Sequence, residues 1–575
     1  MGRELTESLL GERDRSRGEL LPLWSALGFE EPQRAEDLIL AIGEDPFDRG
    51  PLMQFLPHLF LAAAAFGAPD RLVGNFSRFV NAHGSPRYVI SILMTSEPVR
   101  DLSFRLWSHS DALSDVLVRN PEYLEWLLTD AALDITRSRR EFDAEFFSAW
   151  ETGGADDVRA LEAIRRTHRR ELLRIGVRDL LDLAPLREIL HEISWLAETV
   201  VERVLRVHTR AMLREFGVPR AEDEPDGPQV GFCVMGMGKL GGEELNYSSD
   251  IDLMFVYARE GWVWREDAGR SVRGITNHEF FTRLGKRLVQ SLTEWGREGF
   301  LYRVDLRLRP EGDTGPLVRS LESYENYYAS HGETWERMAL IKMRPIAGDR
   351  SVGRALIEAV QPFVFPRHLG ADVLEEIAAI KGRIEREVVR RGPLQSNLKL
   401  GPGGIRDIEF IAQSFQILQA GQHPRLQRRG TIEVLREMGS MGVLQEGEVR
   451  DLIEGYAFLR RLEHRIQMDH QLQTHVLPSD AKTRHRIAKS LGMEDAPRLM
   501  VEVSDRMRRN RALYESSLVQ ERVVGSRART ERERNVQYLI DRLNAGDEPG
   551  VVGCLHTLGW PDHGGRSEGL IPHLR

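Results

Sequence analysis

Apolar residues recur at helical spacing through the first part of the chain. Within residues 161–216 they fall on successive helical turns, at Leu172, Leu173, Ile175, Val177, Leu180, Leu181 and Leu183. Patterns typical of strands are scarce before residue 220. A polar, turn-rich stretch, AEDEPDGPQ, follows at 221–229. We therefore predict an N-terminal helical region over residues 1–225.

The hydrophobic pattern changes next. Two short apolar runs, VGFCVM (230–235) and DIDLMFVY (250–257), predict buried strands, and RVDLRLRP (303–310) alternates polar and apolar residues as a third strand would. Residues 278–295 predict a helix whose apolar face is formed by Phe280, Leu284, Leu288 and Leu292. Strands interleaved with a helix in this order indicate a small α/β domain, to which we assign residues 226–350.

Long amphipathic segments return from about residue 370. They are VLEEIAAIKGRIEREVV, RDIEFIAQSFQILQA and VRDLIEGYAFLRRLEHRIQMD, and they predict a helical bundle over residues 351–530. The charged run GSRARTERER (525–534) indicates a linker. LHTLGWPD near the end echoes LWSALGFEEP near the start, so we expect residues 531–575 to hold a linker and the truncated start of a further domain. The expected fold is mostly α with an inserted α/β domain.

Composition narrows the range of functions. The 575 residues carry 79 Lys and Arg against 88 Asp and Glu, a net charge of -9, which argues against a surface devoted to nucleic acid. Only Cys233 and Cys554 occur, so a reducing compartment is expected. The charged N-terminus lacks the apolar core of a signal peptide, and the most apolar stretch, residues 52–68, is too short and too polar to span a bilayer. We expect a cytoplasmic protein without a membrane partner.

Three aspartates carry the predicted chemistry. Asp250 and Asp252 lie two residues apart on a predicted strand, so both carboxylates point to one side of the sheet. Such neighbours repel each other unless cations neutralise them, and oxygen ligands of this kind suit Mg²⁺ or Mn²⁺. Asp305 supplies a third carboxylate. On the predicted strand it shares a face with Arg307 and Arg309, whose guanidinium groups could bind phosphate oxygens.

A glycine-rich segment, GMGKLGGEELNYSSD (236–250), precedes the aspartates. Its glycines, Gly236, Gly238, Gly241 and Gly242, would let the backbone approach phosphates closely. It is not a Walker loop, because Leu240 follows Lys239 where Ser or Thr would be required. A glycine-rich turn followed by D-x-D on a strand is the layout of polymerase-β-like nucleotidyltransferases.

Each motif also has an ordinary structural interpretation. A D-x-D pair is commonly a solvated strand end, a glycine run is commonly a loop, and an alternating strand can be a charged edge strand. Their order within one small domain favours the metal and phosphate interpretation. Other candidates are weaker: the 17 histidines include no HExxH motif, and we expect His464 and His470 on a solvated helix surface. Met235, Met237 and Met254 are interpreted as core residues.

Four phrases together resemble the glutamine synthetase adenylyltransferase family. They are GMGKLGGEELNYSSDIDLMFVY, RVDLRLRPEGDTGPLVRSLESYENYY, HGETWERMALIKMRPIAGD and NLKLGPGGIRDIEFIAQSFQ. The family implies bifunctional enzymes with two nucleotidyltransferase domains. The C-terminal domain adds AMP to a tyrosine of glutamine synthetase, and the N-terminal domain removes it by phosphorolysis. LNYSSDIDL, HGETWERMALIK and LQRRGTIEVL resemble the adenylyl-removing half.

The resemblance implies roles for single residues. Asp250 and Asp252 would bind metal ions, Asp305 would complete the site, and the glycine loop would position phosphates. Arg307 and Arg309 are candidate phosphate contacts. The wider superfamily usually has Ser after the loop glycine, so the contact falls to either Lys239 or Ser248.

The segment GPGGIRDIEF leaves two interpretations open. Arg406 and Glu409 either face the site or serve in helix packing and capping, since Gly403 and Gly404 precede a predicted helix.

The implied partners are glutamine synthetase, a nucleotide (ADP or ATP), phosphate and, as a further candidate, a PII-type nitrogen-signal protein. Two alternatives stay open: transfer of AMP from ATP to glutamine synthetase, and a docking or regulatory fragment without catalysis. An RNA-directed transferase is least favoured, because no basic stripe with stacking aromatics is evident.

Overall fold

The computed structural model describes residues 2–10, 17–129, 132–152, 156–367, 382, 396–470 and 473–516. This part of the chain is mostly helical, with strands gathered between residues 218 and 348, as expected from the sequence. The predicted helix at 373–389, the linker at 525–534 and the segment 531–575 lie outside the described residues.

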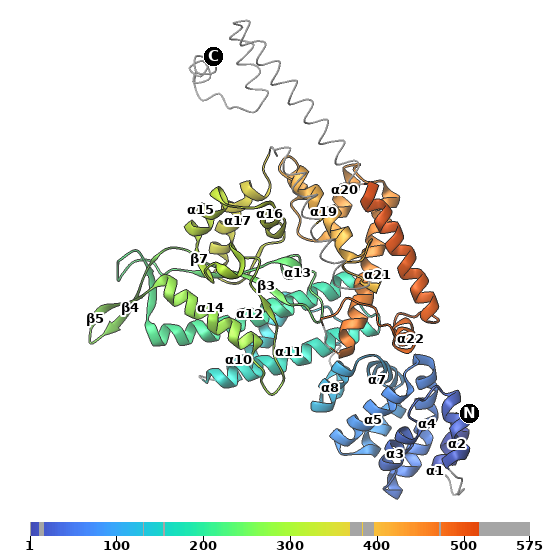
Figure 1. The fold of residues 1–575 in the computed structure, drawn as a ribbon. Helices are drawn as coiled ribbons and strands as arrows, with labels where there is room; N and C mark the ends of the chain where they lie inside the picture. The colour runs from blue at the N-terminus through green and yellow to red at the C-terminus, as the bar shows by residue number, and fades with distance from the viewer. Residues whose placement is uncertain are drawn as a thin grey trace, which may run out of the picture.

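Nine helices form an N-terminal lobe, coloured blue in Figure 1. They are α1 (Gly2–Leu10), α2 (Arg17–Ala26), α3 (Pro32–Ile42), α4 (Pro46–Phe66), α5 (Pro69–His83), α6 (Pro86–Thr95), α7 (Glu97–His109), α8 (Asp111–Arg119) and α9 (Tyr123–Thr129). Five successive helices, α3 to α7, have proline in their first turn, where a missing N–H costs no hydrogen bond. Their apolar faces form one core around Trp24, Phe60 and Trp107.

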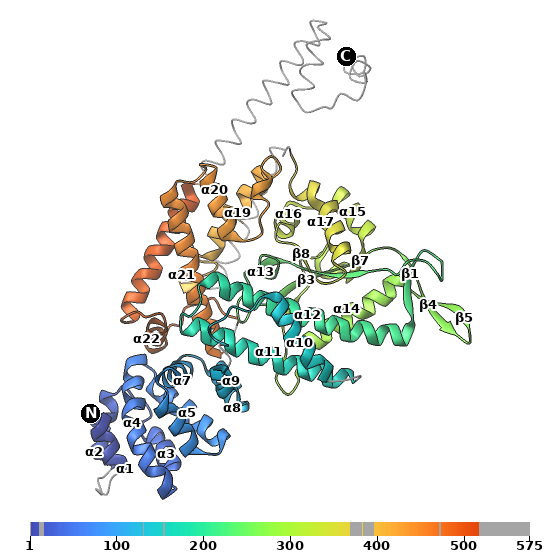
Figure 2. The same ribbon diagram turned by 180° about the vertical axis from the view of Figure 1, so that it is seen from behind.

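Three further helices connect this lobe to the sheet. α10 (Arg139–Thr152), α11 (Asp157–Leu180) and α12 (Leu186–Phe216) lie between the N-terminal lobe and the strands in both Figure 1 and Figure 2. α12 packs along α11, α14 and β8. Buried charges join α11 to α12, because Arg174 pairs with both Glu171 (2.8 Å) and Glu192 (2.5 Å).

The five-stranded sheet has the order β6-β3-β2-β8, and β7 also pairs with β3. Its strands are β2 (Phe232–Gly236), β3 (Ile251–Tyr257), β6 (Val304–Asp305), β7 (Val318–Ser320) and β8 (Arg344–Gly348). β2 is antiparallel to β3 and β8, whereas β6 and β7 run parallel to β3. The parallel return is made through α14 (Asn277–Thr293). The strands predicted at 230–235 and 250–257 and the helix predicted at 278–295 are confirmed as β2, β3 and α14.

The strand predicted over residues 303–310 is wrong beyond Asp305. The Asp305 carboxylate accepts a hydrogen bond from the backbone N–H of Arg307 (2.9 Å), which bends the chain into a turn. Arg309 N–H then bonds to Leu306 O (3.3 Å), so the alternating residues after Asp305 do not share one sheet face. The hydrogen bond from the Arg307 N–H to the Asp305 side chain thus forms in place of the backbone hydrogen bonds that would continue the strand.

A second sheet, β1-β4-β5, was not predicted. It consists of β1 (Val218–Ala221), β4 (Gly261–Asp267) and β5 (Arg270–Thr276), all antiparallel. Ala268 and Gly269 both have positive φ, as a tight two-residue hairpin turn requires. The hairpin projects to one side of the molecule in Figure 1.

The main sheet is covered on both faces, which explains its nearly continuous apolar strands. On β2, Phe232 and Val234 enter the core shared with α10–α12 and α14. Cys233 and Met235 enter the opposite core, shared with the C-terminal helices. On β3, Met254 and Val256 face this second core, together with Met237 of the adjoining turn, so the interpretation of the methionines as core residues is confirmed.

The C-terminal helices cover the second face of the sheet. They are α15 (Leu321–Ser330), α16 (Thr334–Leu340), α17 (Arg350–Val364), α19 (Ile405–Gln419), α20 (Thr431–Ser440), α21 (Glu446–His470), α22 (Ala481–Ser490) and a further helix at 496–516. Short helical turns occur at α13 (Gly238–Gly241), η1 (Gly312–Thr314) and η3 (Pro424–Leu426). Among the described residues, no helix combines the length and the apolar character needed to cross a membrane.

The expectation that His464 lies on a solvated surface is wrong. His464 is fully buried, as are Arg460 and Glu463 on the same face of α21. This face meets α11 and the loop after β2, because His464 shares a hydrogen bond with Asp179 (2.8 Å). Charges that resemble a solvated stripe in the sequence are paired inside the molecule. The side chain of His470 lies outside the described residues.

Asp179 is the junction of three segments. It receives a hydrogen bond from Arg465 Nη1 (2.6 Å) on α21 and one from the Tyr247 hydroxyl (3.1 Å), in addition to His464. The Arg465 guanidinium and the hydrogen bond from His464 hold the pKa of Asp179 well below its usual range against the opposing effect of burial.

We predict that Asp179→Asn lowers the free energy of unfolding by about 3–5 kcal/mol, because the buried Arg465 charge then has only the exposed Asp182 carboxylate, 3.9 Å away, as a counterion. Urea denaturation of the full chain measures this. The exposed Asp226→Asn is the control, with an expected change within about 0.5 kcal/mol. Equal effects of the two substitutions would contradict a structural role for the junction.

Candidate active site

Asp252 and Asp305 are direct neighbours on adjacent strands. In the parallel pairing of β3 with β6, Ile251 is opposite Val304 and Asp252 is opposite Asp305. Residues in register point to the same face, which here is the face covered by the C-terminal helices. Asp250 lies immediately before β3. The sheet therefore brings Asp252 and Asp305 together from segments far apart in the sequence.

Asp252 is the acid with the most perturbed environment. No hydrogen bond or ion pair reaches its carboxylate from the residues that the structure describes. Burial and then the neighbouring Asp305 raise its pKa to about 7, with Lys399 and Lys239 opposing the shift. A carboxylate in this position needs either a proton or a cation.

The other two acids are held by arginines. Asp250 pairs with Arg303 Nε (2.7 Å) and accepts a hydrogen bond from Gln473 Nε2 (3.0 Å). Asp305 is bound by both Nε (3.0 Å) and Nη2 (2.5 Å) of Arg307, whose hydrogen bonds lower the pKa of the acid. In this arrangement no three acidic, His or Cys side chains of the described residues are grouped to hold an ion together.

The glycine turn lies directly against Asp252. Gly238 has φ +52°, and a Cβ atom there would collide with the Asp252 carboxylate. The N–H of Met237 also bonds to the Asp252 carbonyl (2.8 Å). A Cβ on Gly241 would collide with the backbone carbonyl of Lys342. At these two positions glycine permits close approach of the turn to β3 and to the segment before β8.

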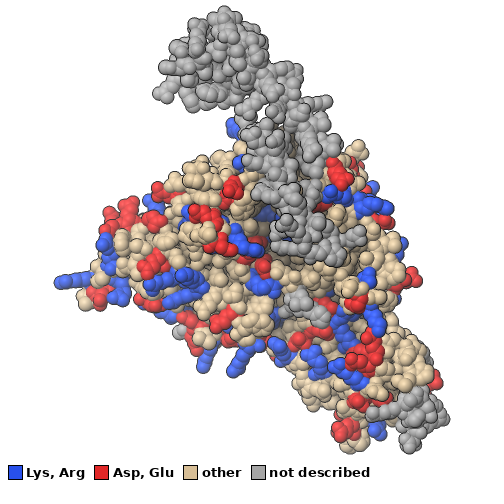
Figure 3. All heavy atoms as spheres, viewed as in Figure 1, with Lys and Arg blue, Asp and Glu red and all other residues tan. Residues whose placement is uncertain are grey.

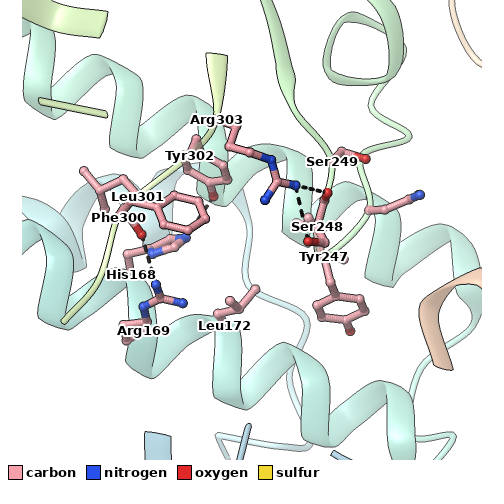
Figure 4. A pocket seen from close by; sticks show the side chains of 12 residues that line it. His168, Arg169, Leu172, Tyr247, Ser248, Ser249, Phe300, Leu301, Tyr302 and Arg303 are labelled. Carbon is pink, nitrogen blue, oxygen red and sulfur yellow. Dashed lines mark hydrogen bonds between the residues drawn. The ribbon is translucent and has the colours of Figure 1, made fainter. Parts of the chain in front are cut away.

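Lys239 and Ser248 have structural partners in this structure. Lys239 Nζ lies 3.4 Å from the buried Glu463 Oε1 on α21, and burial lowers its pKa to about 8. Ser248 is buried, and its carbonyl accepts a hydrogen bond from Arg303 Nη2 (2.5 Å), as Figure 4 shows. Ser248 borders a small cavity of about 30 Å³ that also contacts His168. Lys239, in contrast, borders the larger cavity described next.

A cavity of about 430 Å³ opens in front of Asp252. Gly238, Lys239 and Asp252 of the sheet domain border the cavity, together with Lys399 in the turn before α19 and Arg406 and Glu409 on α19. The interpretation that Arg406 and Glu409 face the site agrees with this position. Lys399 was missed, although it lies in the segment NLKLGPGGIRDIEF, because a single lysine before a glycine turn carries no distinctive spacing.

An apolar wall completes the cavity. It is formed by Leu308, Trp335, Met338, Ala339 and Phe410. Trp335 belongs to α16, and its indole N–H bonds to Glu333 (2.6 Å), which fixes the ring. Apolar and aromatic side chains beside a few charged groups are the lining that small-molecule sites commonly have.

Of the arginines predicted to contact phosphate, neither borders the cavity. Arg307 is occupied by Asp305. Arg309 is mostly buried and donates to the carbonyls of Leu306 (2.7 Å) and Gly315 (3.4 Å), so it stabilises the turn after β6. Elsewhere the visible surface mixes both signs of charge, as Figure 3 shows, without a continuous basic stripe on that face.

We predict a pH-dependent effect of Asp252→Asn on stability. Because the folded-state pKa of Asp252 is raised from 3.8 to about 7, the folded protein binds this proton more tightly than the unfolded chain, and stability falls as pH rises between these values. The variant avoids this loss, so in EDTA it should gain about 2 kcal/mol over the parent at pH 8 and clearly less at pH 5. Urea denaturation at both pH values tests this.

Asp267→Asn on the projecting hairpin is the control, with an exposed side chain and no expected pH-dependent difference. An Asp252→Asn effect of the same size at both pH values would contradict the perturbed carboxylate.

Comparisons with known proteins give two family matches and one close relative. Residues 102–359 match the family described as glutamate-ammonia ligase adenylyltransferase, and residues 378–518 match GlnD PII-uridylyltransferase. A bifunctional glutamine synthetase adenylyltransferase/adenylyl-removing enzyme of Thioalkalivibrio sulfidiphilus (strain HL-EbGR7) is 41% identical over 391 residues, which cover 68% of this chain and 39% of the relative. The chain thus spans well under half the length of that relative. The family match over residues 102–359 includes the β2–β3 turn, the paired aspartates and the part of the apolar wall formed by Leu308, Trp335, Met338 and Ala339. The chain belongs to the glutamate-ammonia ligase adenylyltransferase family.

Proposed function

We propose that the cavity in front of Asp252 catalyses nucleotidyl transfer on glutamine synthetase, in the direction that removes AMP from a modified tyrosine with inorganic phosphate and releases ADP. The relative from Thioalkalivibrio sulfidiphilus is named for both adenylyl transfer and adenylyl removal. The phrases around Trp335 and after Asn246 resemble the removing half, which supports this direction for the present site.

The observation that carries the proposal is the in-register pair of Asp252 and Asp305 beside the glycine turn. Two carboxylates on adjacent strands repel each other, and nothing in the packing of β3 against β6 requires them. Asp252 has no compensating cation within hydrogen-bonding distance among the described residues, whereas both of its neighbours have one. Such a pair is favourable where a ligand supplies positive charge.

The donor set fits Mg²⁺ or Mn²⁺. Carboxylate oxygens are the ligands that these ions prefer, and an ion at Asp252 would replace the proton that its raised pKa favours. Asp252 and Asp305 would hold the ion, with Asp250 as the third ligand. When bound, such an ion neutralises charge on the phosphoryl oxygens during transfer. Release of Asp305 from Arg307 would accompany binding, since the same oxygens serve both.

The protein groups have separate roles in this reaction. The apolar wall around Trp335 would bind the adenine ring, and the turn at Gly238 would place the adenylyl phosphate beside Asp252. An oxygen of hydrogen phosphate attacks the adenylyl phosphorus, the bond from phosphorus to the tyrosine oxygen breaks, and the electron pair stays on that oxygen. The hydrogen phosphate proton passes to the tyrosine oxygen. The products are ADP and free tyrosine.

Two protein partners follow from the proposal. Glutamine synthetase is the substrate. A PII-type signal protein is a candidate effector, supported by the similarity of residues 378–518 to GlnD PII-uridylyltransferase. α21 lies within that range and contacts the turn at Lys239, so binding at the helical bundle has a direct physical path to the cavity.

The test is ADP formation by the full chain from adenylylated glutamine synthetase, Mg²⁺ and phosphate. We expect Asp252→Asn and Asp305→Asn each to lower kcat/KM by at least about 100-fold, equivalent to about 2.7 kcal/mol of transition-state stabilisation. Asp267→Asn should retain the parent rate.

Two outcomes would contradict the proposal. ADP formation that persists in the Asp252→Asn variant would exclude this site. Transfer of labelled AMP from ATP to unmodified glutamine synthetase, without ADP release from the adenylylated form, would assign the opposite direction.

A further inference from the structure

Four basic side chains border the cavity, and they differ in whether they are already paired. Lys239 is paired with Glu463, and Lys342 Nζ lies 2.6 Å from Glu244 Oε2. Both glutamates are buried, and their carboxylates neutralise the charges of these two lysines within the protein. They stabilise the turn after β2 and leave little charge for a ligand.

Lys399 and Arg406 are different. Within the part of the chain that the structure describes, neither side chain forms a hydrogen bond or an ion pair, and both border the cavity together with Gly238 and Asp252. Two unpaired cations bordering one partly enclosed cavity favour an anion between them.

The segment that carries these residues is held rigidly. Asn397 Oδ1 accepts hydrogen bonds from the N–H groups of Lys399 (3.0 Å) and Leu400 (2.8 Å), and the Lys399 carbonyl accepts one from the N–H of Arg406 (3.0 Å). Gly403 has φ +75°, and a Cβ there would collide with the Met507 carbonyl. Lys399 lies in this turn and Arg406 at the start of α19, so both are carried by a backbone held in place by hydrogen bonds, which reduces the entropy cost of binding.

Glu409 provides an independent indication of the ligand. It also borders the cavity, and its Oε1 atom is buried without a hydrogen-bond partner among the described residues. Nearby cations, first Lys342 and then Lys239 and Lys399, lower its pKa, so it is an acceptor only. A ligand that satisfies all three side chains is an anion that also carries a proton to donate. Hydrogen phosphate has this property, and sulfate at neutral pH does not.

We infer that Lys399, Arg406 and Glu409 form a subsite for hydrogen phosphate, separate from the place of the adenylyl phosphate beside Asp252. The inference rests on the proposed function and deepens it, since the bound phosphate is the group that attacks and then becomes the β-phosphate of ADP. Lys399 and Arg406 bind its anionic oxygens, and Glu409 accepts its P–O–H hydrogen bond. No bond to the protein forms or breaks.

The test is calorimetric titration of the full chain, at constant Mg²⁺, with inorganic phosphate, ADP and AMP. We expect Lys399→Met and Arg406→Met each to weaken phosphate and ADP at least 10-fold and to change AMP less than twofold. Lys286→Met and Arg436→Met, at exposed positions away from the cavity lining, should bind all three as the parent does. Thermal unfolding of each variant confirms that it folds.

A sulfate titration tests the role of Glu409. The parent should bind phosphate at least 10-fold more tightly than sulfate, and Glu409→Gln should reduce this preference. Equal affinity of the parent for the two anions would remove Glu409 from the subsite. Unchanged phosphate binding in the Lys399 and Arg406 variants, equal weakening of AMP, or no phosphate and ADP binding by the parent would overturn the inference.

Kinetics separate this inference from the proposed function. Where ADP is formed from adenylylated glutamine synthetase, Lys399→Met should raise KM for phosphate at least 10-fold with little change in kcat, and Lys399→Arg should restore it. If the parent forms no ADP but the titrations depend on Lys399 and Arg406 as expected, the proposed function fails and the subsite stands. If ADP is formed with an unchanged KM for phosphate in Lys399→Met, the subsite fails alone.

Discussion

The buried charged face of α21 is the interaction on which the site depends. Arg460 donates to the Glu244 carbonyl (2.5 Å) in the loop between β2 and β3, and Glu463 pairs with Lys239 at the start of that loop. Gln467 Oε1 accepts a hydrogen bond from Ser248 N–H (3.3 Å) near its end. One helix therefore fixes the loop along its whole length. Burying these charges is costly unless each is paired, so the loop and the helix can pack in only one register.

This arrangement makes the cavity a shared product of two parts of the chain. The sheet contributes Asp252 and the glycine turn, and the helices after residue 396 contribute Lys399, Arg406 and Glu409. The first family match ends at residue 359 and the second begins at residue 378. The first therefore covers the cavity residues of the sheet domain, and the second covers Lys399, Arg406 and Glu409. A sheet domain alone would lack the cations, and a bundle alone would lack the acids. The helical bundle thus has a chemical as well as a structural role.

Charge balance within the site follows one rule. Asp250 and Asp305 are compensated by Arg303 and Arg307, whereas Asp252 is not. Arg307 is largely exposed, so its pairing with Asp305 contributes little to stability and yields readily to a competing cation. Arg303 also donates a hydrogen bond to the Ser248 carbonyl (Figure 4), and this second contact fixes the guanidinium that pairs with Asp250. Asp250 and Asp305 are therefore held in position by arginines, whereas the Asp252 carboxylate between them has no such partner among the described residues.

The local sequence was sufficient to predict secondary structure wherever apolar residues recur with a regular period. Apolar runs located β2 and β3, because backbone geometry fixes the period of a strand. The placement of Asp250 and Asp252 on one side of the strand stays a prediction, since β3 begins at Ile251 and Asp250 lies just before it. The local sequence failed where a side chain competes with the backbone, as at Asp305, whose bond to the Arg307 N–H ends the strand. The hairpin of β4 and β5 was missed because its long-range pairing with β1 supplies much of its definition.

The sequence by itself determined the fold class and the glycine turn, since these depend on neighbours within a few residues, whereas the pairing of Asp252 with Asp305 depends on the sheet register. Only the tertiary structure decided that His464 is buried, that Arg309 serves the turn, and that Lys399 faces Asp252. Whether a charge is solvated, paired or free depends on partners that the local pattern does not identify: Lys239 pairs with Glu463, 224 positions away, whereas Arg309 donates to the carbonyls of Leu306 and Gly315 in its own turn. The physical reason is that electrostatic energy is set by distance in space and by burial, neither of which has a period in sequence.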